Sequence, residues 1–232
     1  MNKFFYNVSV AIPLRQTFTY HSKQKIIPGT RVAVKFGSRS KLGIVTEEIK
    51  ITTIQTKAIH QVLDNEPIFS EVELKILAWA SDYYHHPVGE VLGSFLPTNL
   101  RNIKTVLDDM DSVAKVEIEN NPFQKNLTPQ QTEAVKTLSE LRGFAPTLLY
   151  GVTGSGKTEV YIRCIQEQLL RQKSVLLLAP EIALTPQLEQ RVKDQFGPAV
   201  GMYHSQMTPA KRYKAWKQFR SGEINILIGT RS

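Results

Sequence analysis

An eight-residue stretch from Gly151 to Thr158 has residue types and spacing that can hold a phosphate chain. It reads GVTGSGKT and matches G-x-x-x-x-G-K-[ST] at every fixed position. Glycines let backbone N–H groups turn inward around phosphate oxygens, and a helix that follows points its positive end at the anion. The stretch therefore predicts a nucleotide site in which Lys157 reaches the terminal phosphates and the Thr158 hydroxyl ligates Mg²⁺.

The predicted roles within this loop fall into three groups. The predicted catalytic residues are Lys157 and Thr158, and the predicted metal ligand is Thr158. The predicted cofactor-binding residues of the loop are Gly151, Thr153, Gly154, Ser155, Gly156, Lys157, Thr158 and Glu159. The alternative is a glycine- and serine-rich turn in front of an ordinary helix.

The loop motif leaves the identity of the nucleotide open, and a residue upstream bears on it. A guanine-binding N-K-x-D motif is absent from the sequence, which argues against a GTPase. Gln131 lies twenty residues before the loop, and a glutamine amide can donate to and accept from one edge of adenine. We therefore predict ATP as the nucleotide, with Gln131 beside the adenine. The alternative is that Gln131 only caps a helix, and the two roles are compatible.

Strands and helices are predicted to alternate around this loop from residue 127 onward. Thr128-Pro129-x-Gln131 has the form of a capping box and opens a helix that Gly143 ends. Apolar runs such as VLLLA are typical of parallel strands covered on both faces. The expected strands are 147–150, 174–179, 199–203 and 224–229, and the further helices are 157–172, 185–196 and 208–220.

The first third of the chain is predicted to be a small β-rich domain. Its expected strands are 4–12, 17–20, 31–36 and 42–48, and the last two form a hairpin around the basic loop GSRSK. A Ser70-x-x-Glu73 capping box predicts a helix that runs to about Tyr84. The acidic, polar segment 101–126 is predicted to be a linker with one short strand at 113–118.

Charge is distributed unevenly along these segments. Residues 1–57 hold ten Lys/Arg against two acids, and residues 127–232 hold fourteen against eight, whereas residues 58–126 are acidic. Basic blocks of this kind suggest a polyanionic partner, with solvated surface charge as the alternative. The same two readings apply to the strongly basic helix expected at 209–220.

Composition limits the class of protein. The 232-residue chain is 41% hydrophobic, and it has no run of 18 apolar residues, so we expect no membrane partner. Its first residues make a poor signal peptide. The single cysteine, Cys164, excludes an internal disulfide and a cysteine-rich metal site. These features predict a cytoplasmic protein.

Several motifs taken together resemble the primosomal replication-restart helicase family, PriA. In the second half they are LLYGVTGSGKTEVYI, LLLAPEIALTPQLEQR, YHSQMTPAKRYKAW and GEINILIGTRS. In the first half they are IPLRQTFTY, PGTRVAVKFGSR, KAIHQVLD and WASDYYHHPVGEVLGSFLP. The resemblance covers about 1–100 and 127–232, and it implies an α/β protein. Residues 1–100 would form a β-rich 3′-end DNA-binding domain with a following helix, and 127–232 the first RecA-like helicase lobe with a parallel sheet.

The resemblance also implies an activity, partners and site residues. The family couples ATP hydrolysis to 3′→5′ translocation on single-stranded DNA and recognises stalled replication forks, with primosome and single-strand-binding proteins as partners. It implies a nucleoid-associated location. The implied DNA-binding residues are Phe18, Thr19, Gly37, Lys57, Pro180, Thr185, Thr230 and Arg231. Thr19 stands where the family has an acidic residue, so it would offer a hydroxyl in place of a carboxylate. For Phe18 the alternative is a core aromatic, and for Lys57 a solvated surface lysine.

Parts of the family pattern are missing from the printed residues. The 26 residues 101–126 are too few for the family's winged-helix module, so we expect it to be absent or a remnant. The lobe stops before the acidic Asp-Glu-Glu-His motif (Walker B), and the zinc-binding cysteines of the full-length family are absent. We therefore expect this chain to bind DNA and ATP but to hydrolyse ATP poorly. Two alternatives remain: a non-catalytic 3′-end or fork-binding module with a vestigial nucleotide lobe, and a generic phosphate-loop ATPase or kinase.

Overall fold

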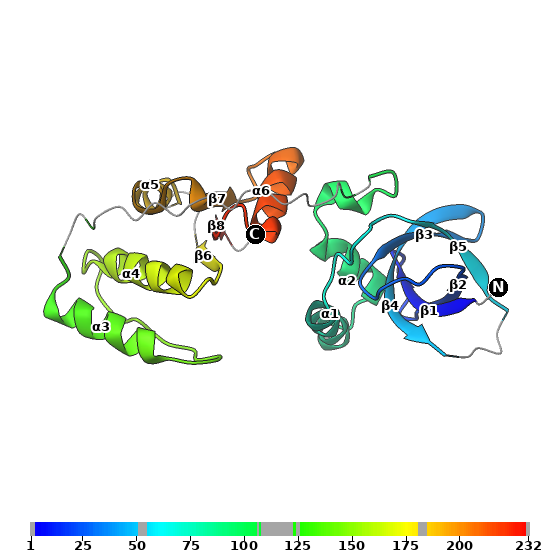
Figure 1. Cartoon of the computed structure of the whole chain (residues 1–232), viewed down its shortest axis with the longest axis horizontal. Coiled ribbons are helices and arrows are strands. Elements are labelled where there is room, and N and C mark those ends of the chain that lie inside the picture. The colour runs from blue at the N-terminus through cyan, green and yellow to red at the C-terminus, as the bar shows by residue number, and fades with distance from the viewer. Residues whose placement is uncertain are drawn as a thin grey trace. The chain divides into compact units, whose positions relative to one another are not determined.

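The chain divides into two compact units, Met1–Asp109 and Met110–Ser232. The computed structural model describes residues 3–50, 55–105, 107, 123, 126–180 and 185–230. Figure 1 shows a small β structure with its helices in the first unit and strands with helices in the second. The division falls inside the segment expected to be a linker. The linker itself, and the expected winged-helix remnant, stay predictions, because most of 106–125, including the expected strand at 113–118, lies outside the described residues.

Five strands of the first unit form a closed barrel in the order β1-β2-β5-β3-β4. Their bounds are β1 Phe4–Val10, β2 Phe18–Ser22, β3 Arg31–Phe36, β4 Arg39–Ile49 and β5 Lys57–Val62. β1 pairs antiparallel with β2 and β4, and β3 pairs antiparallel with β4 and β5. The barrel closes through a parallel pairing of β2 with β5. The expected hairpin at 31–48 is confirmed, but Arg39 and Lys41 belong to β4 and not to its turn.

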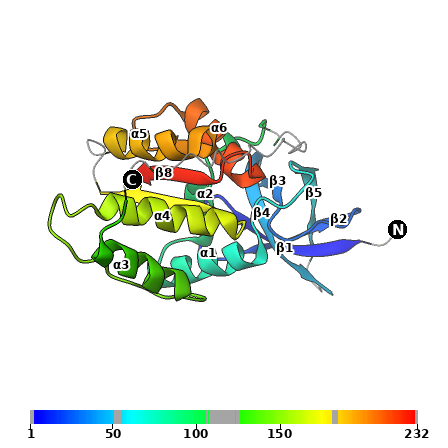
Figure 2. The same ribbon diagram turned by 60° about the vertical axis from the view of Figure 1, so that its left-hand side comes forward.

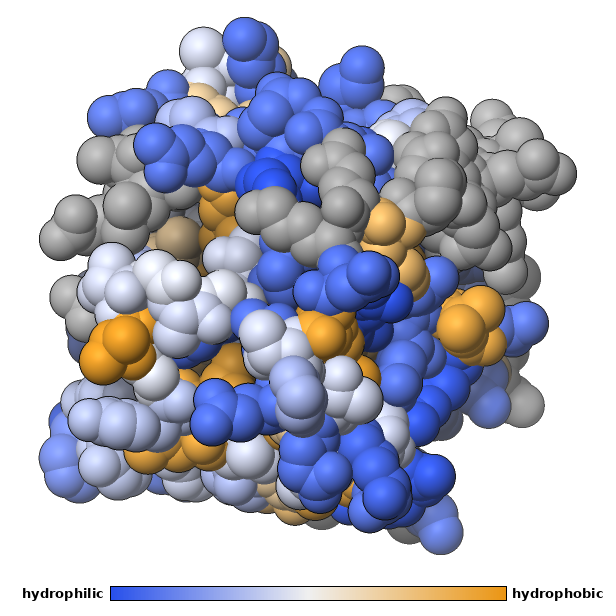
Figure 3. All heavy atoms as spheres, turned by 90° about the vertical axis from the view of Figure 1, so that its left-hand side faces the viewer, coloured by the Kyte–Doolittle hydropathy of each residue, from blue (hydrophilic) through white to orange (hydrophobic). Residues whose placement is uncertain are grey.

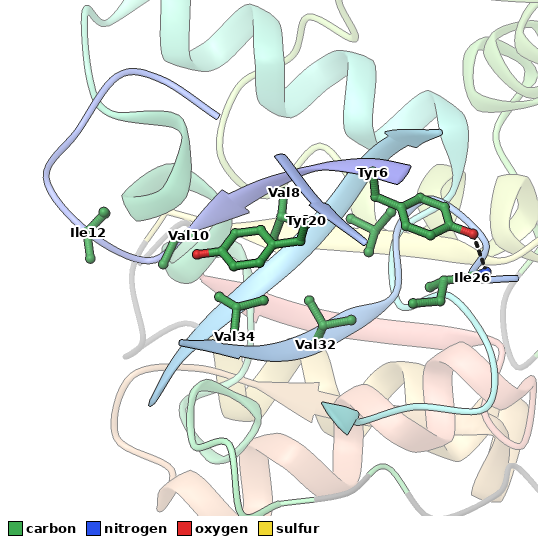
Figure 4. Close-up of a cluster of buried hydrophobic side chains, with 9 residues drawn as sticks. Tyr6, Val8, Val10, Ile12, Tyr20, Ile26, Val32 and Val34 are labelled. Carbon is green, nitrogen blue, oxygen red and sulfur yellow. Dashed lines mark hydrogen bonds between the residues drawn. The ribbon is translucent and has the colours of Figure 1, made fainter. Parts of the chain in front are cut away.

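Alternating side chains of these strands fill the barrel. Figure 4 shows Tyr6, Val8 and Val10 of β1 pointing inward with Val32 and Val34 of β3. The two core tyrosines keep their hydroxyls bonded, because a buried unpaired hydroxyl is costly. Tyr6 Oη accepts the backbone N–H of Ile26 at 2.8 Å, and Tyr20 Oη donates to the carbonyl of Lys35 at 3.1 Å.

Two helices and a 3₁₀ turn follow the barrel in the first unit: α1 Glu71–Tyr83, α2 Val88–Phe95 and η1 Thr98–Arg101. The predicted capping box at Ser70 and Glu73 is confirmed in both directions. The sequence reading missed α2, whose two glycines and preceding Pro87 weaken the helix signal. Gly89 is needed there, because a Cβ at this residue would lie 1.7 Å from the carbonyl oxygen of Val10.

A buried ion pair ties the end of this unit to the barrel. Arg31 and Asp64 have fully buried side chains and make a two-pronged contact, with Nε to Oδ2 at 2.8 Å and Nη2 to Oδ1 at 2.5 Å. The same guanidinium donates to the carbonyls of Leu100 at 2.6 Å and Thr105 at 3.1 Å. Residues 100–105 are therefore held against the barrel and belong to the first unit.

The second unit is built on a three-stranded parallel sheet of order β6-β8-β7. The strands are β6 Val175–Ala179, β7 Val200–Tyr203 and β8 Ile226–Thr230. The helices are α3 Pro129–Glu140, α4 Lys157–Leu170, α5 Thr185–Phe196 and α6 Pro209–Ser221, with a 3₁₀ turn η3 at Gly197–Ala199. α3 and α4 lie side by side (Figure 2). Apolar side chains of α4 and α5 pack on Ile226 and Ile228 of β8 to form the core.

One expected strand is wrong. Residues 147–150 have no regular structure, and Leu148 and Tyr150 are 85% and 89% exposed. A strand needs a neighbour to bond its backbone, and in the described part of the chain no strand pairs with this segment. Figure 3 shows hydrophobic residues standing among hydrophilic ones on the face that it draws. Among the described residues of the second unit, the large apolar side chains that are more than half exposed are Phe144, Leu148, Tyr150, Val152, Leu170, Leu176 and Leu178.

Candidate nucleotide site and nucleic-acid interface

The phosphate-loop motif forms a tight turn that leads directly into α4. Gly154 and Gly156 have φ angles of +83° and +79°, which side-chain-bearing residues rarely adopt. Gly156 is the N-cap of α4, so the loop ends at the positive end of that helix. A Cβ at Gly156 would lie 2.4 Å from Nε2 of Gln131. The loop is therefore shaped by its glycines and by the side chain packed against it.

Lys157 is folded back onto this loop. Its Nζ donates to the carbonyl of Gly151 at 2.6 Å and to that of Val152 at 2.9 Å. A phosphate group in the loop would offer the ammonium a charged acceptor in place of these two neutral carbonyls. The lysine is thus held near the position that the motif predicts, but it is already satisfied by its own loop.

Gln131 joins the start of α3 to the loop. Its Oε1 accepts the backbone N–H of Thr128 at 2.9 Å, and the Thr128 hydroxyl accepts the N–H of Gln131 at 3.3 Å, which confirms the predicted capping box. Its Nε2 donates to the carbonyl of Ser155 at 3.0 Å. One amide N–H and one lone pair of Oε1 then remain uncommitted, so the amide keeps one donor and one acceptor for an adenine contact. The adenine role stays a prediction.

These residues line a pocket of about 1100 Å³ within the second unit. Its lining comprises Asn126, Thr128, Gln131, Thr153, Gly154, Ser155, Gly156, Lys157, Thr158, Glu159, Tyr161, Leu177, Leu178, Ala179, Pro180, Gln187, Leu188 and Arg191. The structure thus brings Gln131 and the predicted loop residues from Thr153 to Glu159 to one cavity. Its volume exceeds the usual range for small-molecule pockets, which leaves room for a nucleotide.

An arginine that the sequence reading missed lies in the same pocket. Arg191 of α5 pairs with the carboxylate of Glu159, one of the predicted cofactor-binding residues. The pair neutralises a carboxylate that would otherwise repel phosphates at the start of α4. On the same helix as Glu159, burial lowers the pKa of Arg163 below its ordinary value, and the charge of Glu159 opposes that shift.

The predicted DNA-facing residues of this unit cluster only in part. Pro180 directly follows β6, and Thr230 ends β8 in register with Ala179, so both lie at the carboxyl edge of the sheet, where ligands of α/β folds bind. Thr185 is the first residue of α5, and Arg231 lies outside the described residues. Their contact with DNA stays a prediction.

A separate pocket of about 380 Å³ opens in the first unit, beside the seam between β2 and β5. It is lined by Gln16, Thr17, Phe18, Thr19, Tyr20, Lys35, Phe36, Gly37, Gln55 and Lys57. The four residues predicted to hold a 3′ nucleotide, Phe18, Thr19, Gly37 and Lys57, therefore come together at one site. Gln16 and Gln55 were missed, because both lie outside the strands and nothing in the local sequence marks them.

Phe18 combines the two roles that the sequence left open, a core aromatic and a residue of the predicted DNA-binding pocket. It packs against the barrel core and makes an edge-to-face contact with Phe36, with ring centroids 5.0 Å apart, yet it also lines the cavity. Gly37 has φ +59° and no atom within 4 Å of a hypothetical Cβ, so a ligand can approach its backbone closely. Lys57 and Lys35 are exposed and add two positive charges at the rim.

Neither a membrane span nor a metal cluster is seen in the described residues. No helix there is both long and apolar enough to cross a bilayer. Across the described ranges, no three His, Cys, Asp or Glu side chains gather as a group that could hold a metal ion.

Comparisons with known proteins define the class of each unit. Residues 7–97 match the model of a 3′ DNA-binding domain described for PriA, and residues 128–232 match the DEAD/DEAH box helicase model. A DNA-binding barrel joined to a helicase domain is thus the class that fold and site define. Relatives that share both parts are curated replication restart proteins, and the chain belongs to the PriA family.

Three relatives illustrate the extent of the match. "Replication restart protein PriA" of Haemophilus influenzae is 30% identical over 301 residues, which cover 97% of this chain and 41% of the relative. The protein of that name from Helicobacter pylori (strain J99) is 34% identical over 215 residues, covering 92% of this chain and 32% of the relative. That of Synechocystis is 48% identical over 106 residues, or 46% of this chain and 13% of the relative. The chain spans about two fifths or less of these relatives.

Proposed function

We propose that this chain forms the DNA-end-binding and ATP-binding part of a replication-restart helicase. That helicase would couple ATP hydrolysis to 3′→5′ movement on single-stranded DNA and would recognise stalled forks. The observation that carries the proposal is the presence of two pockets in one chain, one built on the phosphate loop and one that gathers four residues suited to a strand end. Family membership supports single-stranded and forked DNA, primosome proteins and single-strand-binding proteins as partners.

The residues of the phosphate loop fit ATP and Mg²⁺. The left-handed glycines open the loop, Lys157 would contact the terminal phosphates, and the Thr158 hydroxyl would ligate the metal. When bound, Mg²⁺ supplies positive charge that neutralises the phosphate oxygens. Arg191 keeps the Glu159 carboxylate paired, so that it does not oppose an incoming triphosphate.

The pocket beside β2 and β5 that contains Phe18, Thr19, Gly37 and Lys57, called the DNA-end pocket below, is tested by fluorescence anisotropy. We expect Phe18→Ala to weaken binding of a 3′-ended oligonucleotide by about 1–3 kcal/mol, since a base would lose its stacking partner. Lys57→Gln should reduce the preference for a free 3′ end over a duplex end. Lys23→Gln is the matched control, because Lys23 is exposed in the same unit but does not line the pocket. Equal affinity of the unmodified chain for every kind of end would refute the pocket assignment.

The nucleotide site is tested by titration with a fluorescent ATP analogue. Lys157→Ala should abolish or strongly weaken binding, whereas Lys173→Ala, which removes an exposed lysine from the turn after α4, should not. The alternative function is a DNA-binding module whose nucleotide loop is vestigial. Nucleotide binding that is absent while end recognition persists would support this candidate over the first.

A further inference from the structure

Thr19 lies in a row of three polar side chains that crosses three strands of the barrel. In the antiparallel register Thr19 of β2 faces Asn7 of β1, and Asn7 faces Glu47 of β4. Facing residues of paired strands point to the same side of a sheet. The row therefore leads from the DNA-end pocket, which Thr19 lines, to an exposed carboxylate two strands away.

A β-bulge brings Glu47 into this row. The register of β1 with β4 shifts between Asn7 and Val8, which face Glu47 and Val45, so Thr46 has no opposite residue. Bulges of this kind redirect side chains and are common beside functional sites. The Thr46 hydroxyl donates to the carbonyl of Asn7 at 3.0 Å and so fixes the backbone at the centre of the row.

The chemistry of the three groups determines the direction of every hydrogen bond. An ionised carboxylate only accepts, so the amide NH₂ of Asn7 must face Glu47, and Nδ2 donates to Oε1 at 2.5 Å. The amide oxygen of Asn7 then faces Thr19, whose hydroxyl donates to it at 3.3 Å. The Thr19 hydroxyl has one proton, and this bond uses it. Toward the pocket its oxygen can therefore only accept.

We propose that Asn7 and Glu47 are positioning residues that make Thr19 a hydrogen-bond acceptor for the terminal 3′ hydroxyl group of a DNA strand. The proposal rests on the proposed function of the pocket. It assigns to a threonine, through two neighbours, the accepting role that a carboxylate would have at this position. A DNA end with a free 3′ hydroxyl can donate a hydrogen bond to Thr19. An end that lacks the hydroxyl has no such donor, and the oxygens of a terminal phosphate mainly accept hydrogen bonds. This selectivity opposes the pull of Lys35 and Lys57 on a terminal phosphate.

The test compares one oligonucleotide sequence with three 3′ ends: hydroxyl, hydrogen (dideoxy) and phosphate. For the unmodified chain we expect the hydroxyl end to bind about two- to tenfold more tightly than the dideoxy end, the range for one net hydrogen bond. Thr19→Val should bring this ratio to one. Glu47→Gln should lower it, because an amide at residue 47 no longer dictates which way Asn7 faces, and affinity for the dideoxy end should not change.

Matched variants separate this role from charge and from folding. Glu48→Gln removes the same charge from the next residue of β4, which faces Tyr6 and not Asn7, and should keep the ratio of the unmodified chain. In a Thr19→Asp background the acceptor is supplied directly, so adding Glu47→Gln should have no effect on the ratio. Circular dichroism of each variant checks the fold.

Two kinds of result would overturn the proposal. If the unmodified chain prefers the hydroxyl end but Glu47→Gln retains the full preference, or Glu48→Gln loses it equally, Asn7 and Glu47 do not act through Thr19. If the unmodified chain binds all three 3′ ends alike, Thr19 does not recognise the terminal hydroxyl and the proposal fails, whereas the proposed function of this unit fails only if the chain also binds duplex ends as tightly as single-stranded 3′ ends. The two failures are distinguished by the unmodified chain alone.

Discussion

Breaking the buried ion pair of the first unit should remove a large part of that unit's stability. In Asp64→Ala the Arg31 guanidinium stays fully buried but loses its carboxylate partner, which accepts from Nε, from Nη2 and from the backbone N–H of Arg31. Leaving a buried charge without its partner costs about 3–5 kcal/mol. That is a large share of the roughly 5–15 kcal/mol by which a domain is stable. Asp64→Asn keeps one accepting oxygen and should lose less.

An exposed ion pair in the same unit provides the control. Lys75 and Glu71 are 2.6 Å apart, but their side chains are 73% and 82% exposed. Water screens this pair and competes for both groups, so Glu71→Ala should have no measurable effect on unfolding. The two pairs have nearly the same separation, but the Arg31–Asp64 pair is buried and two-pronged, whereas the Lys75–Glu71 pair is exposed and makes a single contact within one helix. The contrast therefore tests whether a buried, multiply bonded ion pair contributes more to stability than an exposed one.

Urea unfolding monitored by tryptophan fluorescence measures both effects. The two tryptophans are Trp79 in the first unit and Trp216 in the second, so a Trp216→Phe background reports on the first unit alone. With a typical dependence on urea, Asp64→Ala should lower the midpoint by roughly 2 M. A shift no larger than that of Glu71→Ala would refute the reasoning. Equal shifts for Asp64→Asn and Asp64→Ala would refute the part assigned to the remaining oxygen.

Two further predictions concern helix packing and thiol reactivity. Gly89→Ala should destabilise the first unit by about 1–3 kcal/mol, because its Cβ would meet the Val10 carbonyl. In the same helix, a Cβ at Gly93 would have no atom within 4 Å, so Gly93→Ala should stabilise the unit slightly. Equal effects of the two substitutions on urea unfolding would contradict this prediction. Burial, aided by the charge of Glu167, raises the pKa of the Cys164 thiol above its ordinary value, so less of it is thiolate in mildly alkaline solution than in free cysteine. Iodoacetamide should therefore modify Cys164 more slowly than free cysteine, and the rate, followed by mass spectrometry, should still rise at a pH where that of free cysteine has levelled off. A rate that levels off at the same pH as that of free cysteine would contradict the shift.

Local patterns predicted the parts of the fold that local chemistry determines. The capping boxes at Ser70 and Thr128 and the helix after the phosphate loop depend on residues within four positions of one another, and all are confirmed. β5 was missed because most of its residues are exposed and its polar pattern carries no period; it is a strand because β3 and β2 supply partners. Residues 147–150 show the converse, since an apolar run without a partner is not a strand.

The sites were predictable in their residue types but not in their connections. Spacing identified the loop that holds Lys157, yet the bond from Gln131 to Ser155 and the pairing of Arg191 with Glu159 join residues 24 or more positions apart. Likewise the row from Thr19 to Glu47 depends on strand register and on a bulge, and neither is encoded in the spacing of the residues involved. Contacts of this kind require the folded structure.

The barrel is closed by its shortest ladder. β2 and β5 pair at only two positions, Tyr20 with Lys57 and His21 with Ala58, reinforced by a 2.8 Å bond between His21 Nδ1 and Thr56 Oγ1. The barrel should open at the lowest free energy where β2 and β5 pair, and the pocket beside this pairing is lined by Phe18 of β2 and Lys57 of β5. The end of a DNA strand bound there would contact both β2 and β5 and so stabilise the closed barrel. Binding of DNA and closure of the barrel would then be thermodynamically linked, and bound DNA should slow amide hydrogen exchange in β2 and β5.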